Sequence, residues 1–354
     1  MSDKWIRTGV RKMQGYVPGE QPSQPDLIKL NTNENPYPPA PGVLRALREI
    51  APDALRRYPP PTSKHLRACI AKTYAFPEEG VFCGNGSDEI LALCTRAYVE
   101  KCRKVGYFDP SYSLYPVLAS IAESDTVEVV LQDQFEWVDP PLDADIDLFF
   151  LTNPNAPTGM QFPMDRIYNF CKAFDGVVLI DEAYVDFAEN DCIAFARELP
   201  NVIVSRSLSK SYSLAGLRVG YALGSPALIE ALDKIKDSYN LDVVAQQLAI
   251  EALEDQAYMR ACVDRIRNTR TWFAAALEKR GFMLYPSETN FVWCKPPACL
   301  PAGDYLEALR SRNILIRHFV APRLNPFVRI TIGREEQMEK LIQETDKILE
   351  VANG

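Results

Sequence analysis

The sequence predicts an α/β protein with three parts: a large domain built on a seven-stranded, mainly parallel sheet covered by helices, a smaller α+β C-terminal domain, and an extended N-terminal arm. Seven short apolar runs alternate with segments of helical periodicity. Several runs are β-branched and bounded by Gly, Pro, Asn or Asp, as buried strands are. Strands that alternate with helices form parallel sheets with both faces covered. The runs lie at 81–83, 104–108, 126–131, 148–152, 177–181, 202–205 and 219–223.

The arm and the two domains follow one another along the chain. Residues 1–42 form the arm, since closely spaced prolines near its end exclude a helix there. Residues 43–245 form the large domain. A long helical stretch at 243–280, ended by Gly281, leads into the small domain at 246–354. The elements expected in the small domain are strands at 290–294, 314–316 and 327–332, a helix at 304–311 and a closing helix from residue 335.

Composition excludes several classes of protein. The 354 residues contain 39 Lys and Arg against 47 Asp and Glu, a net charge of −8. Without a basic block such a chain is a poor nucleic-acid binder. No segment approaches the roughly 18 apolar residues of a membrane span, and the first residues do not resemble a secretory signal. Nine cysteines without a C-x-x-C pair predict reduced thiols in the cytoplasm. With only two histidines, neither a metal site nor a histidine-based triad is expected.

A glycine-rich turn follows the first apolar run and opens a helix. Gly84-Asn85-Gly86-Ser87 exposes backbone N–H groups at a helix start, which is an anion site. The dinucleotide fingerprint needs a third glycine, and Glu89 stands in its place, so a nicotinamide site is disfavoured. An ordinary capped turn is the other interpretation.

Three charged residues mark the ends of later strands, where ligands bind in α/β sheets. Asp181 ends the run at 177–181, Lys210 follows the next run, and Arg218 precedes the last. Considered alone, Asp181 fits a metal ligand, a base, a partner of a cation or a helix cap. Lys210 considered alone fits a solvated charge or a buried nucleophilic amine. Ser207-x-x-Lys210 also fits the penicillin-recognising hydrolases, but the S-D-N and K-T-G elements of that class are missing.

One ligand explains the amine, the carboxylate, the arginine and the glycine turn together. Pyridoxal phosphate needs an amine for its aldehyde, a carboxylate for its ring nitrogen, and a cation with N–H donors for its phosphate. The chain contains four motifs that carry a family resemblance: D-E-A-Y at 181–184, S-x-S-K at 207–210, G-L-R-x-G at 216–220 and P-x-x-P-T-G at 154–159. With them, the sequence resembles the fold-type I pyridoxal-phosphate aminotransferases. More narrowly, it resembles the histidinol-phosphate aminotransferases, from the arm at 30–36 to the segment at 328–333.

The resemblance implies roles for individual residues. Lys210 would bind the cofactor and move the substrate proton, Asp181 would hold the ring nitrogen, and Tyr184 would approach the phenolic oxygen O3′. Tyr112 would stack on the ring, and Tyr58 would reach the phosphate from a neighbouring subunit, which makes the protein a homodimer with shared sites. The residues implied at the phosphate are Gly86, Ser87, Ser207, Ser209 and Arg218, and those implied at the substrates are Tyr16, Asn33, Arg317 and Arg329. Simple packing remains the other interpretation of Tyr58 and Tyr112.

Two positions are open. The family segment ends N-P-T-G, with the asparagine at O3′, whereas this chain has Ala156 there. Either Asn155 takes over this contact through a shifted backbone, or Tyr184 holds O3′ alone. Arg317 is favoured over Arg323 at the substrate because it ends an apolar run, and a solvated position is the alternative for both.

The implied reaction is transamination of L-histidinol phosphate with 2-oxoglutarate, giving imidazole acetol phosphate and glutamate in histidine biosynthesis. An aromatic amino-acid aminotransferase or a threonine-phosphate decarboxylase on the same scaffold is the alternative. A cofactor sensor fused to a DNA-binding module is disfavoured, since the chain has no helix-turn-helix segment before the arm and no basic patch.

Overall fold

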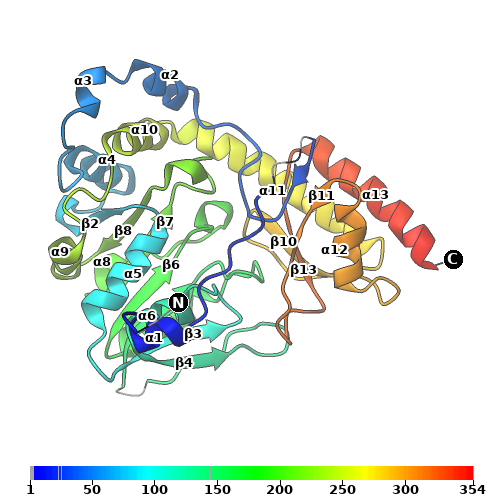
Figure 1. Ribbon diagram of the computed structural model, residues 1–354, viewed down its shortest axis with the longest axis horizontal. Helices are drawn as coiled ribbons and strands as arrows, with labels where there is room; N and C mark the ends of the chain where they lie inside the picture. The colour runs from blue at the N-terminus through cyan, green and yellow to red at the C-terminus, as the bar shows by residue number, and fades with distance from the viewer. Residues whose placement is uncertain (1–3, 23, 25, 143–144, 354) are drawn as a thin grey trace.

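A seven-stranded sheet forms the centre of the large domain in the computed structural model, which describes residues 4–22, 24, 26–142 and 145–353 (Figure 1). The strands lie in the order β2-β8-β7-β6-β5-β3-β4. They are β2 (Val81–Gly84), β3 (Lys104–Asp109), β4 (Asp125–Val130), β5 (Ile146–Thr152), β6 (Val177–Asp181), β7 (Val202–Ser207) and β8 (Gly220–Gly224). The seven predicted strands and the mainly parallel sheet are confirmed.

Strand β8 is the exception to the parallel arrangement, and it lies between the edge strand β2 and β7. It runs antiparallel to both neighbours, so that Gly220 pairs with Gly84 of β2 and with Ser207 of β7. The start of β8 therefore meets the ends of β2, β6 and β7. This is why Arg218, which precedes its strand, lies at the same edge as residues that follow theirs.

Helices cover both faces of the sheet because successive strand residues alternate between two apolar cores. On β5, Leu148 and Phe150 belong to the core beneath α5, α6 and α9, whereas Phe149 and Leu151 belong to the larger core on the other face. The helices are α2 (Pro41–Glu49), α3 (Pro52–Leu55), α4 (Lys64–Tyr74), α5 (Ser87–Tyr98), α6 (Tyr115–Ile121), α7 (Met164–Ala173), α8 (Ile193–Glu198), α9 (Pro226–Ile235) and α10 (Val243–Glu254), with short 3₁₀ turns η1 (Glu78–Gly80), η2 (Val185–Phe187) and η3 (Ala215–Leu217).

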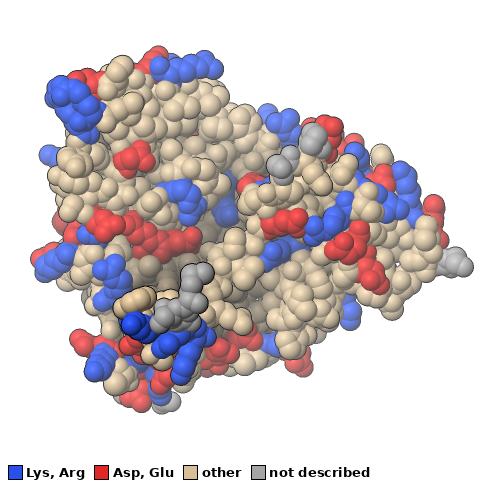
Figure 2. Space-filling view, in the orientation of Figure 1, with Lys and Arg blue, Asp and Glu red and all other residues tan. Residues whose placement is uncertain are grey.

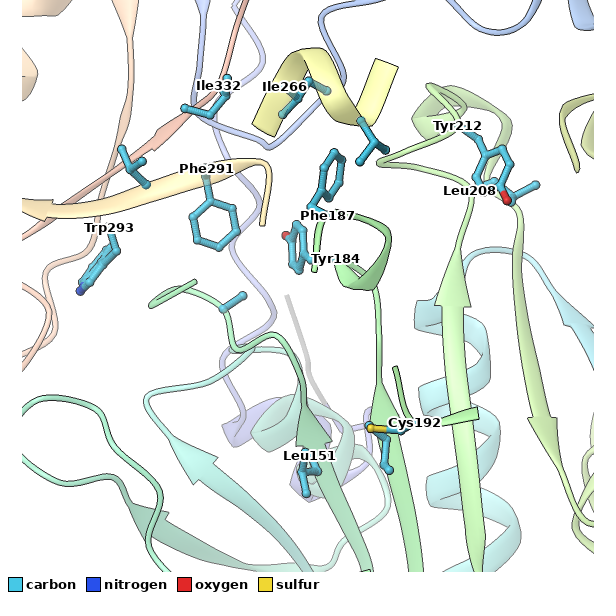
Figure 3. Packing of buried hydrophobic residues seen from close by; sticks show 14 of the residues in the cluster. Leu151, Tyr184, Phe187, Cys192, Leu208, Tyr212, Ile266, Phe291, Trp293 and Ile332 are labelled. Atoms are coloured by element: carbon cyan, nitrogen blue, oxygen red, sulfur yellow. The ribbon is translucent and has the colours of Figure 1, made fainter. Parts of the chain in front are cut away.

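The small domain has an antiparallel sheet in the order β12-β13-β10-β9. Its core is continuous with that of the large domain, as Figure 3 shows: Phe291 and Trp293 of β10 lie near Tyr184 and Phe187, which follow β6. The elements are α11 (Gln256–Glu278), β9 (Met283–Leu284), β10 (Phe291–Lys295), α12 (Ala302–Arg310), β11 (Ile314–Leu315), β12 (Arg317–His318), β13 (Val328–Thr331) and α13 (Glu335–Asn353).

Two local expectations need correction, and one predicted strand has a distant partner. The helix predicted at 243–280 is two helices, since Asp255 accepts a hydrogen bond from the Tyr258 N–H and so caps α11 as a separate helix. The strand predicted at 314–316 is present as β11, and it pairs with β1 (Ile28–Lys29) of the arm. The arm also contains a short helix, α1 (Thr8–Lys12), which lies beside α6 (Figure 1).

Within the described part of the chain, no helix combines the length and apolar character that a membrane crossing requires.

Candidate active site

A cavity of about 220 Å³ lies at the edge of the sheet where β6 and β7 end and β8 begins. Its wall combines residues of the arm, the large domain and the small domain. Figure 2 shows this face of the molecule hollowed between the two domains, with Lys or Arg atoms visible in the hollow. The predicted site residues at the wall are Tyr16, Asn33, Ser87, Tyr112, Asp181, Tyr184, Ser207, Ser209, Lys210, Arg218, Arg317 and Arg329.

Lys210 reaches the cavity from the turn that follows β7. The turn is held by Ser207, whose Oγ accepts a hydrogen bond from the Ser209 N–H at 3.1 Å. The lysine Nζ donates one long hydrogen bond of 3.4 Å to the Thr32 carbonyl and lies 5.7 Å from the centre of the Tyr184 ring. An ammonium has three N–H donors. Among the described residues one of them has a partner, so the others are available to a ligand in the cavity.

Asp181 is the last residue of β6 and is 3% exposed. Its carboxylate accepts hydrogen bonds from the Tyr115 hydroxyl at 3.0 Å and from the Ala183 N–H at 3.2 Å. Burial raises the pKa of this carboxyl to about 6. Above that pH it is a buried anion without a cation in hydrogen-bond contact among the described residues, a state that a protonated ring nitrogen would stabilise.

An anion site lies where α5 begins. Gly86 precedes the helix with φ of +80°, a conformation that favours glycine, and no side chain caps the first turn. The Arg218 guanidinium lies against Gly86 and pairs with Asp88 at 3.3 Å. Free N–H groups, the helix dipole and a guanidinium together attract a phosphate.

Hydroxyl and amide groups surround the space between Lys210 and the small domain. The Asn33 Nδ2 donates to the Tyr184 hydroxyl at 2.8 Å, which leaves the tyrosine proton free to be donated into the cavity. The Tyr112 hydroxyl donates to Asp88 at 3.2 Å, and the Tyr16 ring meets the Tyr112 ring edge-on at 5.7 Å.

Two arginines line the small-domain side of the cavity on paired strands, Arg329 on β13 and Arg317 on β12. Arg329 is held between the rings of Phe291 and Phe319, with its carbon Cζ 5.2 and 5.4 Å from their centres. It donates to the Asn31 carbonyl at 3.1 Å, while its buried Nε has no partner. Burial lowers the pKa of the Arg329 guanidinium, yet an arginine stays charged in proteins. Arg329 is thus a half-buried cation without a carboxylate partner among the described residues, which is an arrangement that suits an anionic ligand.

Three predicted residues are not at this wall. Asn155 donates its amide to the Pro110 carbonyl and to Thr158 Oγ1, so it holds a turn, and Ala156 faces the cavity instead. The structure thus offers no support for Asn155 at O3′. Gly86 does not line the cavity, and its backbone N–H donates to the Gly84 carbonyl at 2.9 Å. Tyr58 is 81% exposed and stacks on Tyr239 with ring centres 4.4 Å apart, away from the cavity of its own chain.

Several residues of the site were missed by sequence reasoning. Asp88 pairs with Arg218, and Tyr115 holds Asp181, although neither belongs to a motif that requires it.

Arg323 is not solvated, since its guanidinium donates to the carbonyls of Asp109, Leu131 and Gln132 at 2.7 to 3.1 Å and so ties the small domain to the ends of β3 and β4.

The residues present fit pyridoxal phosphate. The poorly satisfied amine of Lys210, the buried carboxylate of Asp181 and the uncapped start of α5 beside Arg218 surround one cavity. They match the aldehyde, the ring nitrogen and the phosphate of that cofactor. In the described part of the chain, no three His, Cys, Asp or Glu side chains form a cluster of the kind that holds a metal ion.

Comparison with known proteins shows the family of the chain. Residues 25–344 match the family model described as aminotransferase class I and II. The histidinol-phosphate aminotransferase of Citrifermentans bemidjiense is 44% identical over 339 residues, 96% of this chain and 97% of that protein. The enzyme of the same name from Microcystis aeruginosa is 40% identical over 343 residues, 97% of this chain and 98% of its own. The structure of the Sinorhizobium meliloti histidinol-phosphate aminotransferase in complex with pyridoxal-5′-phosphate superposes with a TM-score of 0.80 at 29% identity, covering 89% of both chains.

Proposed function

The chain belongs to the aminotransferase class I and II family, and we propose that it transfers the amino group of L-histidinol phosphate to 2-oxoglutarate with pyridoxal phosphate as cofactor. The products are imidazole acetol phosphate and glutamate, in a step of histidine biosynthesis. The relatives of this name, matched over nearly the whole chain, support the reaction. The structural observation that carries it is one cavity lined by Lys210, Asp181 and the half-buried Arg329, whose buried Nε has no hydrogen-bond partner.

The cofactor would be held at three points. Asp181 would bind the ring nitrogen, and the start of α5 with Arg218 would bind the phosphate. The amine of Lys210 would bind the cofactor covalently through its aldehyde. When bound, pyridoxal phosphate supplies the aldehyde that takes up an amino group and the ring that withdraws electrons from it. Tyr184, whose oxygen already accepts from Asn33, has its proton available for O3′. With Ala156 at the wall, Tyr184 is the protein donor that we assign to this oxygen.

Proton transfer falls to Lys210. Its Nζ is the basic group that faces the middle of the cavity, between the Tyr184 ring and the Thr32 carbonyl. We assign it the removal of the proton from the substrate α-carbon and its return at the neighbouring centre, which is general acid–base work by one positioned amine. His318 donates its Nε2 proton to the Asn325 carbonyl at 2.8 Å, outside the cavity wall, and takes no part.

Arg329 and Arg317 would bind the anionic groups of both substrates in turn. A guanidinium donates two parallel hydrogen bonds to a carboxylate or to a phosphate with the same geometry. A phosphate on one substrate and a carboxylate on the other therefore suit one pair of arginines. Tyr16 closes the same space from the arm.

A second copy of the chain would complete the site. Tyr58 and neighbouring apolar residues of α2 and α3 are exposed in the single chain, including Leu44, Leu47 and Leu55. Unpartnered apolar surface of this kind marks an interface. We assign this surface to a homodimer in which Tyr58 reaches the phosphate site of the other subunit.

The proposed substrate is tested by measuring glutamate formed from 2-oxoglutarate with three amines in parallel. L-histidinol phosphate is expected to give the highest kcat/KM. A higher value for phenylalanine would show an aromatic amino-acid aminotransferase. Release of carbon dioxide from threonine phosphate without glutamate would show the decarboxylase.

A further inference from the structure

A chain of buried hydroxyl groups ends on Asp181 from the side of the large-domain core. The Tyr115 hydroxyl donates to the Asp181 carboxylate at 3.0 Å, and Thr152 Oγ1 lies 2.6 Å from the same hydroxyl oxygen. Ser111 Oγ lies 3.1 Å from Thr152 Oγ1 and reaches the cavity wall again. Tyr115 is 0% exposed and Thr152 is 2% exposed. The four residues come from the loop after β3, the start of α6 and the ends of β5 and β6.

From this geometry we infer that Tyr115, supported by Thr152, is a positioning residue that holds Asp181 ionised and aimed at the cofactor's ring nitrogen. The inference rests on the proposed cofactor, but it does not depend on which amine is the substrate. Tyr115 itself does not line the cavity, so it acts through Asp181.

The ionised state of Asp181 determines the direction of every hydrogen bond in the chain. A carboxylate only accepts, so Tyr115 uses its single proton on Asp181. The phenol oxygen then accepts from Thr152, and Thr152 Oγ1 accepts from Ser111. All three protons are thereby aimed toward Asp181, and hydrogen bonds aligned in this way strengthen one another in a dry interior. Burial raises the pKa of the Tyr115 phenol well above its ordinary value, so it stays a donor.

The tyrosine ring is fixed where the proposal needs it. It stacks on Phe150 of β5 with ring centres 4.6 Å apart and an angle of 10°, and it meets Tyr112 edge-on at 5.7 Å. Its backbone N–H bonds to the Tyr112 carbonyl at 3.1 Å, at the start of α6. The hydroxyl therefore has little freedom to leave Asp181.

The hydroxyl chain opposes the effect of burial on Asp181. Burial raises the pKa of this carboxyl to about 6, while the bonds from Tyr115 and from the Ala183 N–H lower it. The other charged groups facing it are Asp88 from α5, which raises the pKa, and Lys210 from the turn after β7, which lowers it. Loss of the Tyr115 proton donor removes one of the groups that keep the carboxylate ionised at neutral pH.

The test is equilibrium binding of pyridoxal phosphate to apoprotein across pH 5 to 8, with no substrate present. In the wild type, affinity falls on acidification as Asp181 takes up a proton. In Tyr115→Phe we expect the midpoint of this fall to move up by about one pH unit, the effect of one hydrogen bond to a charged group. Affinity should then be roughly tenfold lower than in the wild type near pH 5, and roughly twofold lower at pH 7. Tyr305→Phe is the matched control, since Tyr305 is equally buried and its hydroxyl lies 2.7 Å from Thr345 Oγ1 in the small domain.

A second pair of variants keeps the proposal open to refutation if Tyr115→Phe does not fold. Thr152→Val removes the supporting donor and should shift the midpoint in the same direction by less, while Thr152→Ser should restore it. Wild-type midpoints in both Tyr115→Phe and Thr152→Val would overturn the inference, as would an equal shift in Tyr305→Phe. A wild type that binds the cofactor with this pH profile but does not use L-histidinol phosphate would refute the proposed substrate and leave this inference standing.

Discussion

The two glycines of the segment 216–220 provide a sharp test of how the phosphate site is built. A Cβ atom at Gly220 would lie 2.6 Å from the Ser87 backbone nitrogen and 2.7 Å from the Gly86 carbonyl carbon. Both contacts are to backbone, which cannot rotate away. A Cβ at Gly216 would meet nothing within 4 Å. Gly220→Ala and Gly216→Ala therefore add the same methyl group four residues apart, one into the site and one into open space.

The expected cost follows from the overlap. Ordinary contacts of a Cβ begin at 3.4 Å, so the methyl at Gly220 intrudes by several tenths of an ångström on two atoms at once. Relief requires β8 to move away from the start of α5. Overpacking of this size costs about 1–3 kcal/mol, and the movement separates the Ser87 N–H from Arg218. Gly216→Ala is expected to raise the free energy of unfolding by about 0.4–1 kcal/mol, because alanine reduces the conformational freedom of the unfolded chain.

Both quantities are measurable on purified protein. Urea unfolding of the apoprotein gives the free-energy difference, and titration with pyridoxal phosphate gives the affinity. We expect Gly220→Ala to be less stable and to bind the cofactor more weakly, with Gly216→Ala unchanged or slightly more stable. Equal stability and equal affinity in the two variants would refute the close approach of β8 to the phosphate turn.

Three further expectations concern other parts of the molecule. Arg323→Ala should lower the free energy of unfolding by about 2 kcal/mol through the loss of its bonds to three carbonyls; an unchanged urea midpoint would contradict the tie between domains. The pKa of Asp181 is about 6 in the folded protein and 3.8 ordinarily, so between these pH values the folded state binds more protons than the unfolded state. The free energy of unfolding of the apoprotein should therefore fall by up to about 3 kcal/mol as pH rises from 4 through 6, relative to Asp181→Asn. Parallel pH profiles of the two proteins would contradict the raised pKa. If sites are shared, mixing Tyr58→Phe and Lys210→Ala subunits should restore activity that neither impaired homodimer has; no recovery after demonstrated subunit exchange would contradict the contact.

Much of the large domain is predictable from local pattern. Its strands are buried on both faces, so each reads as a short apolar run between turn residues, and all seven were found in this way. Asp181 and Lys210 follow from the rule that ligands gather at strand ends. That rule alone did not explain Arg218, which precedes its strand. The antiparallel direction of β8 does, and pairing direction is a tertiary property.

The errors of prediction arise where a distant partner decides the outcome. The strand at 314–316 was predicted as a strand, but its pairing could not be, because its partner β1 lies in the arm nearly 300 residues earlier. Asp255 was passed over as a helix cap because apolar periodicity continues on both sides of it. Arg323 finds its carbonyl partners in the other domain.

The same reason applies inside the site. Tyr115 follows Tyr112 at helical spacing, which in sequence looks like ordinary packing. Its importance depends on β5 and β6 lying side by side, so that Thr152 and Asp181 end at the same level. A hydroxyl chain assembled from three segments has no sequence motif.

The decisive measurement is one half-reaction, followed in purified protein loaded with pyridoxal phosphate and without any keto acid. L-histidinol phosphate is added, and both the visible spectrum of the bound cofactor and the amount of imidazole acetol phosphate are recorded. We expect the visible band to bleach rapidly with one product molecule formed per site, while Lys210→Ala gives no product. If L-histidinol phosphate leaves the spectrum unchanged while phenylalanine bleaches it, the proposed substrate is wrong; if Lys210→Ala forms product as fast as the wild type, the assigned chemistry of the site is wrong.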